Sequence, residues 1–417
     1  MATENNNKNL NVPNLRFPEF SGEWDRIKVS DLLEFYPTNS LSWSQLEYSE
    51  EGVLNLHYGL IHKGLPTQVD VFENSLPIIK EEFIPKKISL CLNGDVAFAD
   101  ASEDTNDVAK CIEFANCDGK KIVCGLHTIH GRDTQNKTVT GYKGYAFSAQ
   151  AFREQIRRLA QGTKIYSINS GNFSECYIGI PSKVEQSKIA NLLLAVDQRL
   201  AAQIKIIEDL KKLKSAISNK LFARKDLLEK QITISEIGTL KNGYAFQSST
   251  YNPAGSYKII TIANVSGERY IDIDSCNCIM RIPEDIQTHQ VLKQDDILIS
   301  LTGNVGRVSL CTEGNYLLNQ RVGLLQLKQG VNREYIYQAL SCRRFEQTMI
   351  SCGQGAAQMN IGKGDVEDYT IPYSANSLNL EVVASTLKTY DLLISVEVDK
   401  LRLFMQQKQY LLAQMFI

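Results

Sequence analysis

The sequence predicts an α+β fold in which two similar mixed α/β domains are separated by two long antiparallel helices that pack like a coiled coil. Three observations support this prediction. Apolar residues recur in alternating steps of four and three from Ile189 to Leu221, which is the seam of a helix packed against another helix. The same seam returns from Val383 to Met415. Short motifs that precede the first helix also reappear before the second.

The two seams are interrupted at the same places, at a constant displacement of 194 positions. Polar residues break the first seam at Gln203 and Lys214 and the second at Glu397 and Lys408. Unrelated helices would share the spacing but would seldom share its interruptions. We therefore expect an internal duplication with a pseudo-twofold axis, in which Gln203 and Glu397 meet near the middle of the helix pair and fix its register. Two further pairs coincide in the same way: Asp197 with Asp391, and Phe222 with Phe416.

The domain boundaries follow from this repeat. Ile27–Leu32 resembles Ile232–Ile237, and Asn93–Phe98 resembles Gln294–Ile299. Ser30 is a plausible N-cap for a short helix in the first domain. The predicted parts are a flexible tail over 1–16, a first domain over 17–180, a long helix over 181–224, a second domain over 225–372 and a second long helix over 373–417.

Bulk composition excludes several classes of protein. The net charge of −2 and the pI of about 6.3 give no support for nucleic-acid binding, so any basic surface must be local. The ten cysteines contain no C-x-x-C motif, which favours reduced thiols in the core over a disulfide framework. No apolar run approaches the roughly 20 residues that a membrane span needs. We expect a cytoplasmic protein without a membrane partner.

The motifs of a self-sufficient enzyme are missing from the sequence. It contains no G-x-x-x-x-G-K-[ST] phosphate loop, no glycine-rich S-adenosylmethionine fingerprint and no convincing nuclease core. A group of cysteines and histidines does occur in the first domain, but its spacing matches none of the usual ligand pairs. We therefore expect neither catalysis nor a bound metal. The members of that group are Cys111, Cys117, Cys124, His127 and His130.

Several segments together resemble the specificity (S) subunit of type I restriction–modification systems, over nearly the whole chain. Arg16–Trp24 (RFPEFSGEW) is similar to the family's N-terminal segment, and Ile180–Ile189 (IPSKVEQSKI) is similar to its central helix. Asn242–Ser249 (NGYAFQSS), Asp296–Arg307 (DILISLTGNVGR) and Leu318–Val322 (LNQRV) resemble a target-recognition domain. The second long helix departs from the pattern, because Asn379-Leu380 stand where Glu185-Gln186 stand in the first.

This resemblance implies a non-catalytic subunit with two target-recognition domains. Each domain would read one half of a bipartite sequence in double-stranded DNA. The two helices would set the spacer and dock two modification subunits, which methylate adenine with S-adenosylmethionine. A restriction subunit would add translocation and cleavage driven by ATP and Mg²⁺. The chain itself would then hold no cofactor.

Candidate DNA-binding residues are polar or basic side chains on expected loops and at domain edges. Arginine suits guanine or phosphate, and asparagine suits adenine. Turns between strands could equally place these side chains without any ligand. The candidates are Lys63, His127, Arg132, Lys164, Ser167, Asn169, Lys241, Tyr244, Gln247, Ser248, Thr302, Asn304, Arg307, Asn319, Gln320, Arg321, Gln354, Gln358, Asn360 and Lys363.

Two other functions fit the same pattern. The chain could be a non-catalytic scaffold whose duplicated domains bind protein, or a stand-alone DNA-binding regulator. The basic run Lys211–Lys214 is likewise open to two interpretations, since it could be a solvated helix face or could follow spacer phosphates.

Overall fold

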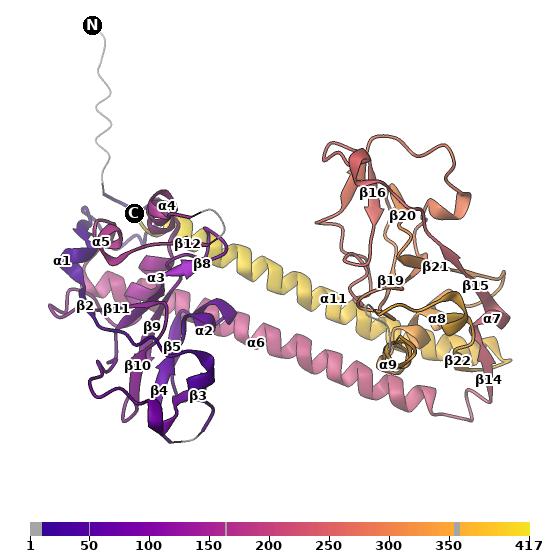
Figure 1. Ribbon diagram of the computed structural model, residues 1–417, viewed down its shortest axis with the longest axis horizontal. Helices are drawn as coiled ribbons and strands as arrows, with labels where there is room; N and C mark the ends of the chain where they lie inside the picture. Colours follow the sequence, from indigo (N-terminus) through magenta and orange to yellow (C-terminus); the bar gives the residue numbers. More distant parts are fainter. Residues whose placement is uncertain (1–10, 50, 163–164, 354–358) are drawn as a thin grey trace, which may run out of the picture. The chain divides into compact units, whose positions relative to one another are not determined.

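The computed structural model describes residues 11–49, 51–162, 165–353 and 359–417. The chain divides into two compact units, one formed by Met1–Ile204 with Lys400–Ile417 and the other by Lys205–Asp399. Each unit therefore combines one mixed domain with one half of each long helix, α6 (Lys183–Phe222) and α11 (Ser377–Gln414) (Figure 1). The predicted α+β fold with duplicated domains and two long antiparallel helices is confirmed.

The first unit is built on a five-stranded sheet of order β2-β11-β7-β9-β5 and a four-stranded sheet of order β10-β4-β6-β3. Two further strand pairs, β1-β13 and β12-β8, tie the ends of the domain together. Its strands are β1 Asp25–Lys28, β2 Glu34–Tyr36, β3 Leu46–Glu47, β4 Val53–Leu56, β5 Gln68–Asp70, β6 Ile78–Ile79, β7 Val96–Ala99, β8 Ala101–Ser102, β9 Cys111–Asn116, β10 Lys121–Cys124, β11 Thr128–Arg132, β12 Tyr166–Ser167 and β13 Tyr177–Ile180. Its shorter helices are α1 Val29–Leu32, α2 Tyr58–Lys63, α3 Tyr142–Ser148, α4 Gln150–Leu159 and α5 Ser170–Ser174.

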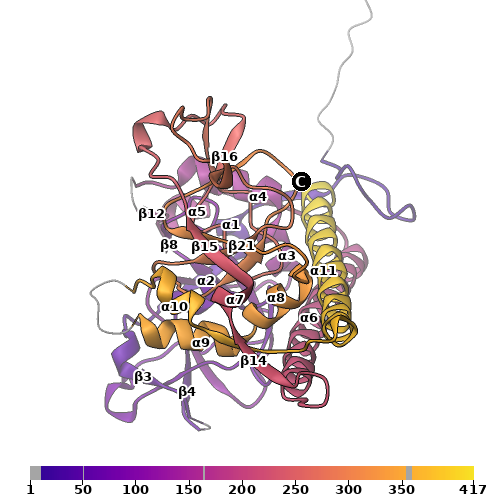
Figure 2. The same ribbon diagram turned by 90° about the vertical axis from the view of Figure 1, so that its right-hand side faces the viewer.

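The second unit has a four-stranded sheet of order β15-β21-β18-β19, a three-stranded sheet of order β17-β16-β20 and the pair β14-β22. Helices α8 and α10 pack against the four-stranded sheet (Figure 2). The strands are β14 Lys230–Thr233, β15 Gly238–Asn242, β16 Tyr257–Ile260, β17 Asn277–Ile279, β18 Ile297–Ser300, β19 Val308–Leu310, β20 Tyr316–Leu318, β21 Val322–Leu327 and β22 Thr370–Tyr373. The shorter helices are α7 Ile234–Ile237, α8 Arg333–Leu340, α9 Arg343–Cys352 and α10 Lys363–Glu367.

The strand pairing shows the internal repeat directly. In the first unit β1 pairs antiparallel with β13, and in the second β14 pairs antiparallel with β22 in the same way. Strands β2, β11 and β7 of the first unit then correspond to β15, β21 and β18 of the second, because both sets pair antiparallel in that order. The short helix that follows the first strand recurs as well, as α1 and α7.

The start of α1 corrects one expectation. Ser30 lies inside the helix, and Lys28 is the residue that precedes it. The pairing of β1 with β13 extends as far as Lys28, so the chain turns into the helix two residues earlier than a serine cap would require. The second copy does carry a capping motif, in which Thr233 and Glu236 form the reciprocal bonds of a capping box at the start of α7.

Each unit contains one half of the antiparallel helix pair. In the first unit, Ile189 and Leu193 of α6 share a core with Leu411 of α11 and with Met415, which directly follows that helix. In the second unit, Leu221 of α6 packs against the core that contains Val383 and Leu387 of α11. The residues that interrupt the seams form equivalent ion pairs, Lys408 Nζ with Asp197 Oδ1 at 2.5 Å and Lys214 Nζ with Asp391 Oδ1 at 2.6 Å. The shared interruptions therefore join the two helices in each unit.

Residues of the predicted tail make specific contacts. The amide of Leu15 donates to the carbonyl of Gln414, and Arg16 Nε donates to Glu185 Oε1 at 2.7 Å. Trp24 Nε1 donates to the same carboxylate at 3.3 Å. The chain from Asn11 onward is thus packed on the first unit, whereas residues 1–10 lie outside the described part. Among the described helices, none is long and apolar enough to cross a membrane.

Candidate nucleic-acid interface

Four loops of the second domain converge at one end of its four-stranded sheet. The amide of Tyr244 donates to the carbonyl of Leu318, and the amide of Leu301 donates to that of Arg321. Thr302 forms an isolated antiparallel bridge with Asn360. We call the surface formed by Tyr244, Thr302–Asn304, Asn319–Arg321 and Asn360 the second-domain edge. It unites residues that are more than 100 positions apart in the sequence.

The side chains at the second-domain edge fall into two groups. Asn304, Gln320, Arg321 and Asn360 are exposed. Asn319, by contrast, is buried, and its Oδ1 accepts from the amide of Arg321, so this side chain shapes the turn. The exposed group offers three side-chain amides and one guanidinium, which are the donors and acceptors that read base edges and phosphates.

The remaining candidates of the second domain lie around this edge or already have partners. The hydroxyl of Tyr244 donates to Asp285, Arg307 Nε lies 3.7 Å from Glu346, and Lys363 lies 3.6 Å from Glu367. Gln247 and Ser248 are exposed in the turn that follows Tyr244. Lys241 is half-buried on β15, and the predicted residues Gln354 and Gln358 lie outside the described residues.

The first domain repeats the backbone connections of the second-domain edge. The amide of Asp100 donates to the carbonyl of His127, as Leu301 does to Arg321. Ile168 donates to Asp100, as Ile361 does to Leu301, and Ser167 pairs with Ala101, as Asn360 does with Thr302. His127 and Ser167 therefore occupy the places of Arg321 and Asn360. We call the surface formed by Asp100–Ser102, His127 and Ser167 the first-domain edge.

A ladder of rings borders the first-domain edge. The ring of Trp43 lies 4.5 Å from that of His57, His57 lies 4.7 Å from Tyr58, and Tyr58 lies 5.2 Å from His127. Lys63 Nζ stands 5.5 Å from the Trp43 ring. Burial lowers the pKa of His57, and the neighbouring His127 and Lys63 lower it further. The imidazole of His57 accepts from the amide of Gly59 and so caps α2.

The first domain also contains candidates that the structure places elsewhere. Arg132 points into the domain, where its Nε and Nη2 donate to Asp95 at 2.8 and 2.7 Å and its guanidinium lies over the Tyr36 ring. Asn169 caps α5 through the amide of Asn172. Lys164 lies outside the described residues. The predicted register contact joins Gln203 of the first unit to Glu397 of the second, and it stays a prediction.

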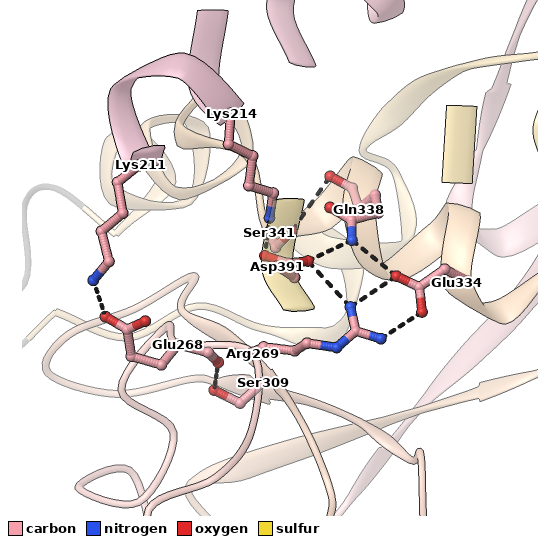
Figure 3. Close-up of polar contacts among 9 residues, drawn as sticks. All are labelled: Lys211, Lys214, Glu268, Arg269, Ser309, Glu334, Gln338, Ser341 and Asp391. Carbon is pink, nitrogen blue, oxygen red and sulfur yellow. Dashed lines mark hydrogen bonds and ion pairs between the residues drawn. The ribbon is translucent and has the colours of Figure 1, made fainter. Parts of the chain in front are cut away.

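A polar network fastens the second domain to its half of the helix pair (Figure 3). Arg269 donates twice to Glu334 of α8, at 2.8 and 2.6 Å, and its Nη1 also donates to Asp391 of α11 at 3.1 Å. Gln338 donates to both carboxylates, and Lys214 of α6 bonds to Asp391. Two cations thus balance two carboxylates at the junction of a loop, α6, α8 and α11.

The basic run on α6 takes part in these contacts. Lys214 belongs to the network, and Lys211 Nζ lies 2.7 Å from Glu268 (Figure 3). Both lysines are engaged within the second unit. The equivalent carboxylate of the first unit, Asp197, accepts from the hydroxyl of Tyr145 and pairs with Lys408, so the same device recurs with a tyrosine in place of Gln338.

The helix position at which the two copies differ has a structural explanation. Glu185, which is 1% exposed, binds Arg16 and Trp24 of the N-terminal segment. Its counterpart Asn379 donates instead to the carbonyl of Leu227, in the segment that joins α6 to the second domain. Each helix start therefore binds the chain that leads into its own domain, and the side chain differs because the leading segments differ.

The comparisons with known proteins agree with this architecture. Residues 229–401 match the model of the family described as type I restriction modification DNA specificity domain. The chain is 24% identical over 411 residues to a putative type I restriction enzyme specificity subunit, MjaX, of Methanocaldococcus jannaschii, covering 94% of this chain and 92% of that protein. The segment over residues 229–401 thus belongs to this DNA specificity domain family, and the chain as a whole is similar to a type I specificity subunit. The general role of this family is the recognition of a DNA target, and its specificity subunits are generally non-catalytic.

Solved specificity subunits share the fold. The S subunit of M. genitalium superposes with a TM-score of 0.55 at 16% identity, over 97% of this chain and 99% of that one. A chain from a type I restriction–modification complex gives 0.56 at 14% identity, over 95% and 98%. At these identities the likeness concerns the fold alone, and it extends over 95–97% of this chain.

Sequence reasoning missed two groups that the specificity-subunit fold assembles. Trp43, His57, Tyr58 and His62 form or border the ring ladder, yet Trp43 begins a short 3-10 helix while the other three stand at the start of α2 and within it. Arg269 was missed because its partners lie 65 and 122 positions away. The available signal was Asp391 itself. This carboxylate stands inside an apolar helix pattern and therefore requires a cation as its partner.

Proposed function

We propose that this chain is a specificity subunit that reads a bipartite target in double-stranded DNA through its two edges, one half-sequence for each domain. The equivalence of the two edges carries the proposal, because the same backbone connections present His127 and Ser167 in one domain and Arg321 and Asn360 in the other. The side chains differ although the scaffold is the same. Two different half-sequences are the expected consequence.

The chemistry of each edge suits DNA. At the second-domain edge, Arg321 can bind guanine or phosphate, and Gln320 and Asn360 can each offer a bidentate amide to adenine. At the first-domain edge, Lys63 and the exposed ring of Trp43 supply charge and an aromatic face beside His127. These groups give local affinity even though the chain as a whole has a net charge of −2.

We further propose that the helices set the spacer and dock two modification subunits. The 40 residues of α6 extend over roughly 60 Å. On α11, exposed apolar side chains occur away from the seam in each unit, Val382 and Val396 in the second and Leu403 and Tyr410 in the first, each at least 50% exposed. The matching positions of α6 carry Lys188, Ala202, Asp209 and Ala216. Exposed apolar side chains of this kind support a protein partner.

The cofactors of the assembled enzyme would then lie outside this chain. S-adenosylmethionine belongs to the modification subunits, and ATP and Mg²⁺ belong to a restriction subunit. The assembly would act as an adenine methyltransferase and, with the restriction subunit, as an endonuclease.

A target-independent binding measurement tests the DNA proposal. The chain, purified with its modification subunits, is titrated onto a random-sequence duplex between 50 and 200 mM salt. Removing a phosphate contact should reduce the slope of log affinity against log salt by about 1. Removing a base contact should leave that slope unchanged and should alter which DNA sequences the protein prefers. We expect Lys63→Ala and Arg321→Ala each to weaken DNA binding, with either a smaller salt slope or a changed sequence preference.

Matched controls lie at the far ends of neighbouring strands. Lys328 follows the end of β21 opposite to Arg321, and Lys121 begins β10, which ends near the first-domain edge. Both are exposed. Lys328→Ala and Lys121→Ala should bind as the unmodified chain does. Edge variants that bind and select DNA just like these controls would overturn the proposal.

A further inference from the structure

Three buried side chains of the first domain bring two sulfurs and an imidazole together. Cys91, Cys124 at the end of β10 and His130 of β11 are 2%, 1% and 0% exposed. Their potential ligand atoms all lie within 4.8 Å of one another, and the two sulfurs are 3.6 Å apart. In a tetrahedral zinc site with bonds of about 2.3 Å, two thiolates stand roughly 3.8 Å apart. The spacing of the two sulfurs is therefore close to that of two thiolates on one zinc ion, with the nearer imidazole nitrogen of His130 within 4.8 Å of both.

The imidazole of His130 is held in the manner of a metal ligand. Its Nε2 lies 2.8 Å from Asp95 Oδ2, while its Nδ1 is buried and has no partner among the described residues. Asp95 also accepts two bonds from Arg132, and these bonds keep it a carboxylate. Metal-binding histidines commonly donate one ring N–H to a carboxylate and use the other nitrogen as the ligand. An unpaired buried nitrogen is otherwise costly.

The charges of the cluster favour a divalent ion. Asp95 and Arg132 neutralise each other. Two thiolates and a neutral imidazole would carry a charge of −2, which a divalent cation balances in a site that excludes water. Sulfur and imidazole ligands select a soft or borderline metal such as zinc over calcium or magnesium.

We propose that Cys91, Cys124 and His130 bind a structural zinc ion. Each thiol releases its proton on binding, and His130 contributes a lone pair. The ion would connect β10 of the four-stranded sheet with β11 of the five-stranded sheet, close to the first-domain edge. The fourth position is open to water or to Cys117, which lies in the same hydrophobic cluster. This departs from the metal-free expectation, which considered a group of neighbouring residues and omitted the distant Cys91.

Metal analysis of the full chain tests this inference. The untagged chain is expressed in zinc-supplemented medium, purified under reducing conditions and analysed for zinc. We expect roughly one zinc per chain, and replacement by Co²⁺ should produce the visible bands of a tetrahedral site and a thiolate charge-transfer band. Cys91→Ser and Cys124→Ser should lose the metal, whereas Cys311→Ser, a buried thiol of the second unit, should retain it.

The Co²⁺ spectrum of the unaltered chain decides the matter even if the serine variants fail to fold. A weaker charge-transfer band in Cys117→Ser would place that thiol in the fourth position, and an unchanged band would place water there; both results support the site. Zinc far below one per chain together with no thiolate band would overturn it. A mass lower by two hydrogens, lost on reduction and mapped to Cys91 and Cys124, would also overturn it in favour of a disulfide.

Discussion

Replacing Arg269 by glutamine removes one of the two cations from the network of the second unit. The network then holds one uncompensated negative charge among side chains that are 9–19% exposed. Removing one partner of a buried ion pair costs about 3–5 kcal/mol. We expect the lower end, about 3 kcal/mol, because Glu334 retains some access to water. For a unit of this size, that loss lowers Tm by roughly 6–12 °C.

The assay can separate the two units. Both tryptophans, Trp24 and Trp43, lie in the first unit, so their fluorescence reports that unit alone. Hydrogen exchange of β18 and β21 reports the second unit. R269Q should reduce protection in the second unit by about 3 kcal/mol and leave tryptophan unfolding unchanged within about 0.5 kcal/mol. The control is Arg224→Gln, which breaks an exposed pair with Asp226 in the same unit and should leave both signals unchanged.

The pH dependence gives a second signature. Burial raises the pKa of Glu334, but bonds from Arg269 and Gln338 outweigh it and hold that pKa below its ordinary value of 4.5. The unmodified chain therefore loses this contribution as the pH falls through that range. In R269Q burial dominates, the pKa rises, and protonation relieves the unpaired carboxylate. The difference in unfolding free energy between the unmodified chain and R269Q should therefore become smaller as the pH falls. If R269Q and R224Q behaved alike, the reasoning would be refuted.

Three further predictions concern the first unit and the two edges. Glu185→Ala should destabilise the first unit by about 1.5–3 kcal/mol, read from Trp24 fluorescence, because Arg16 loses its charged acceptor; an effect no larger than that of Asn379→Ala would contradict this. Because the pKa of His57 is lowered from 6.5, the unfolded chain takes up its proton first and stability should fall as the pH drops below 6.5; His57→Asn, which can still cap α2, should remove that component, and an unchanged pH profile of Trp43 unfolding would count against it. Gly243→Ala should weaken DNA binding through the second-domain edge, because a Cβ there collides with the carbonyl of Asn319, while Gly330→Ala, which is strained by a φ of 84° but whose Cβ meets open space, should leave DNA binding unchanged.

Much of the fold could be predicted because the repeat records it in the sequence. Periodicity identifies the face that a helix packs against its partner, and the shared interruptions at Lys214 and Lys408 predicted that the two helices are copies of each other. The correspondence of β7 with β18 was also visible in the sequence, because an aspartate precedes each strand. In the structure these aspartates make equivalent bonds within their own turns, Asp95 with the amide of Leu92 and Asp296 with the amide of Lys293.

The candidate site was less accessible because it depends on long-range pairing. Arg321 and Asn360 meet only when β18, β21 and a later loop come together, and no local pattern specifies that meeting. Arg132 shows the opposite difficulty. Its alternation with His130 along β11 indicates a shared face, but sequence could not reveal that Asp95 lies opposite and binds both side chains.

The account rests on the claim that each domain reads its own half of the target, and a methylation map of the host genome tests that claim most directly. The map is made with the gene deleted, restored, and restored as the edge variants R321A or H127A. We predict a two-part motif that disappears on deletion. Each edge variant should relax or weaken one half of that motif and leave the other half intact, with R321A and H127A affecting opposite halves. Variants that alter both halves together, or a genome in which no methylated motif depends on the gene, would contradict the account.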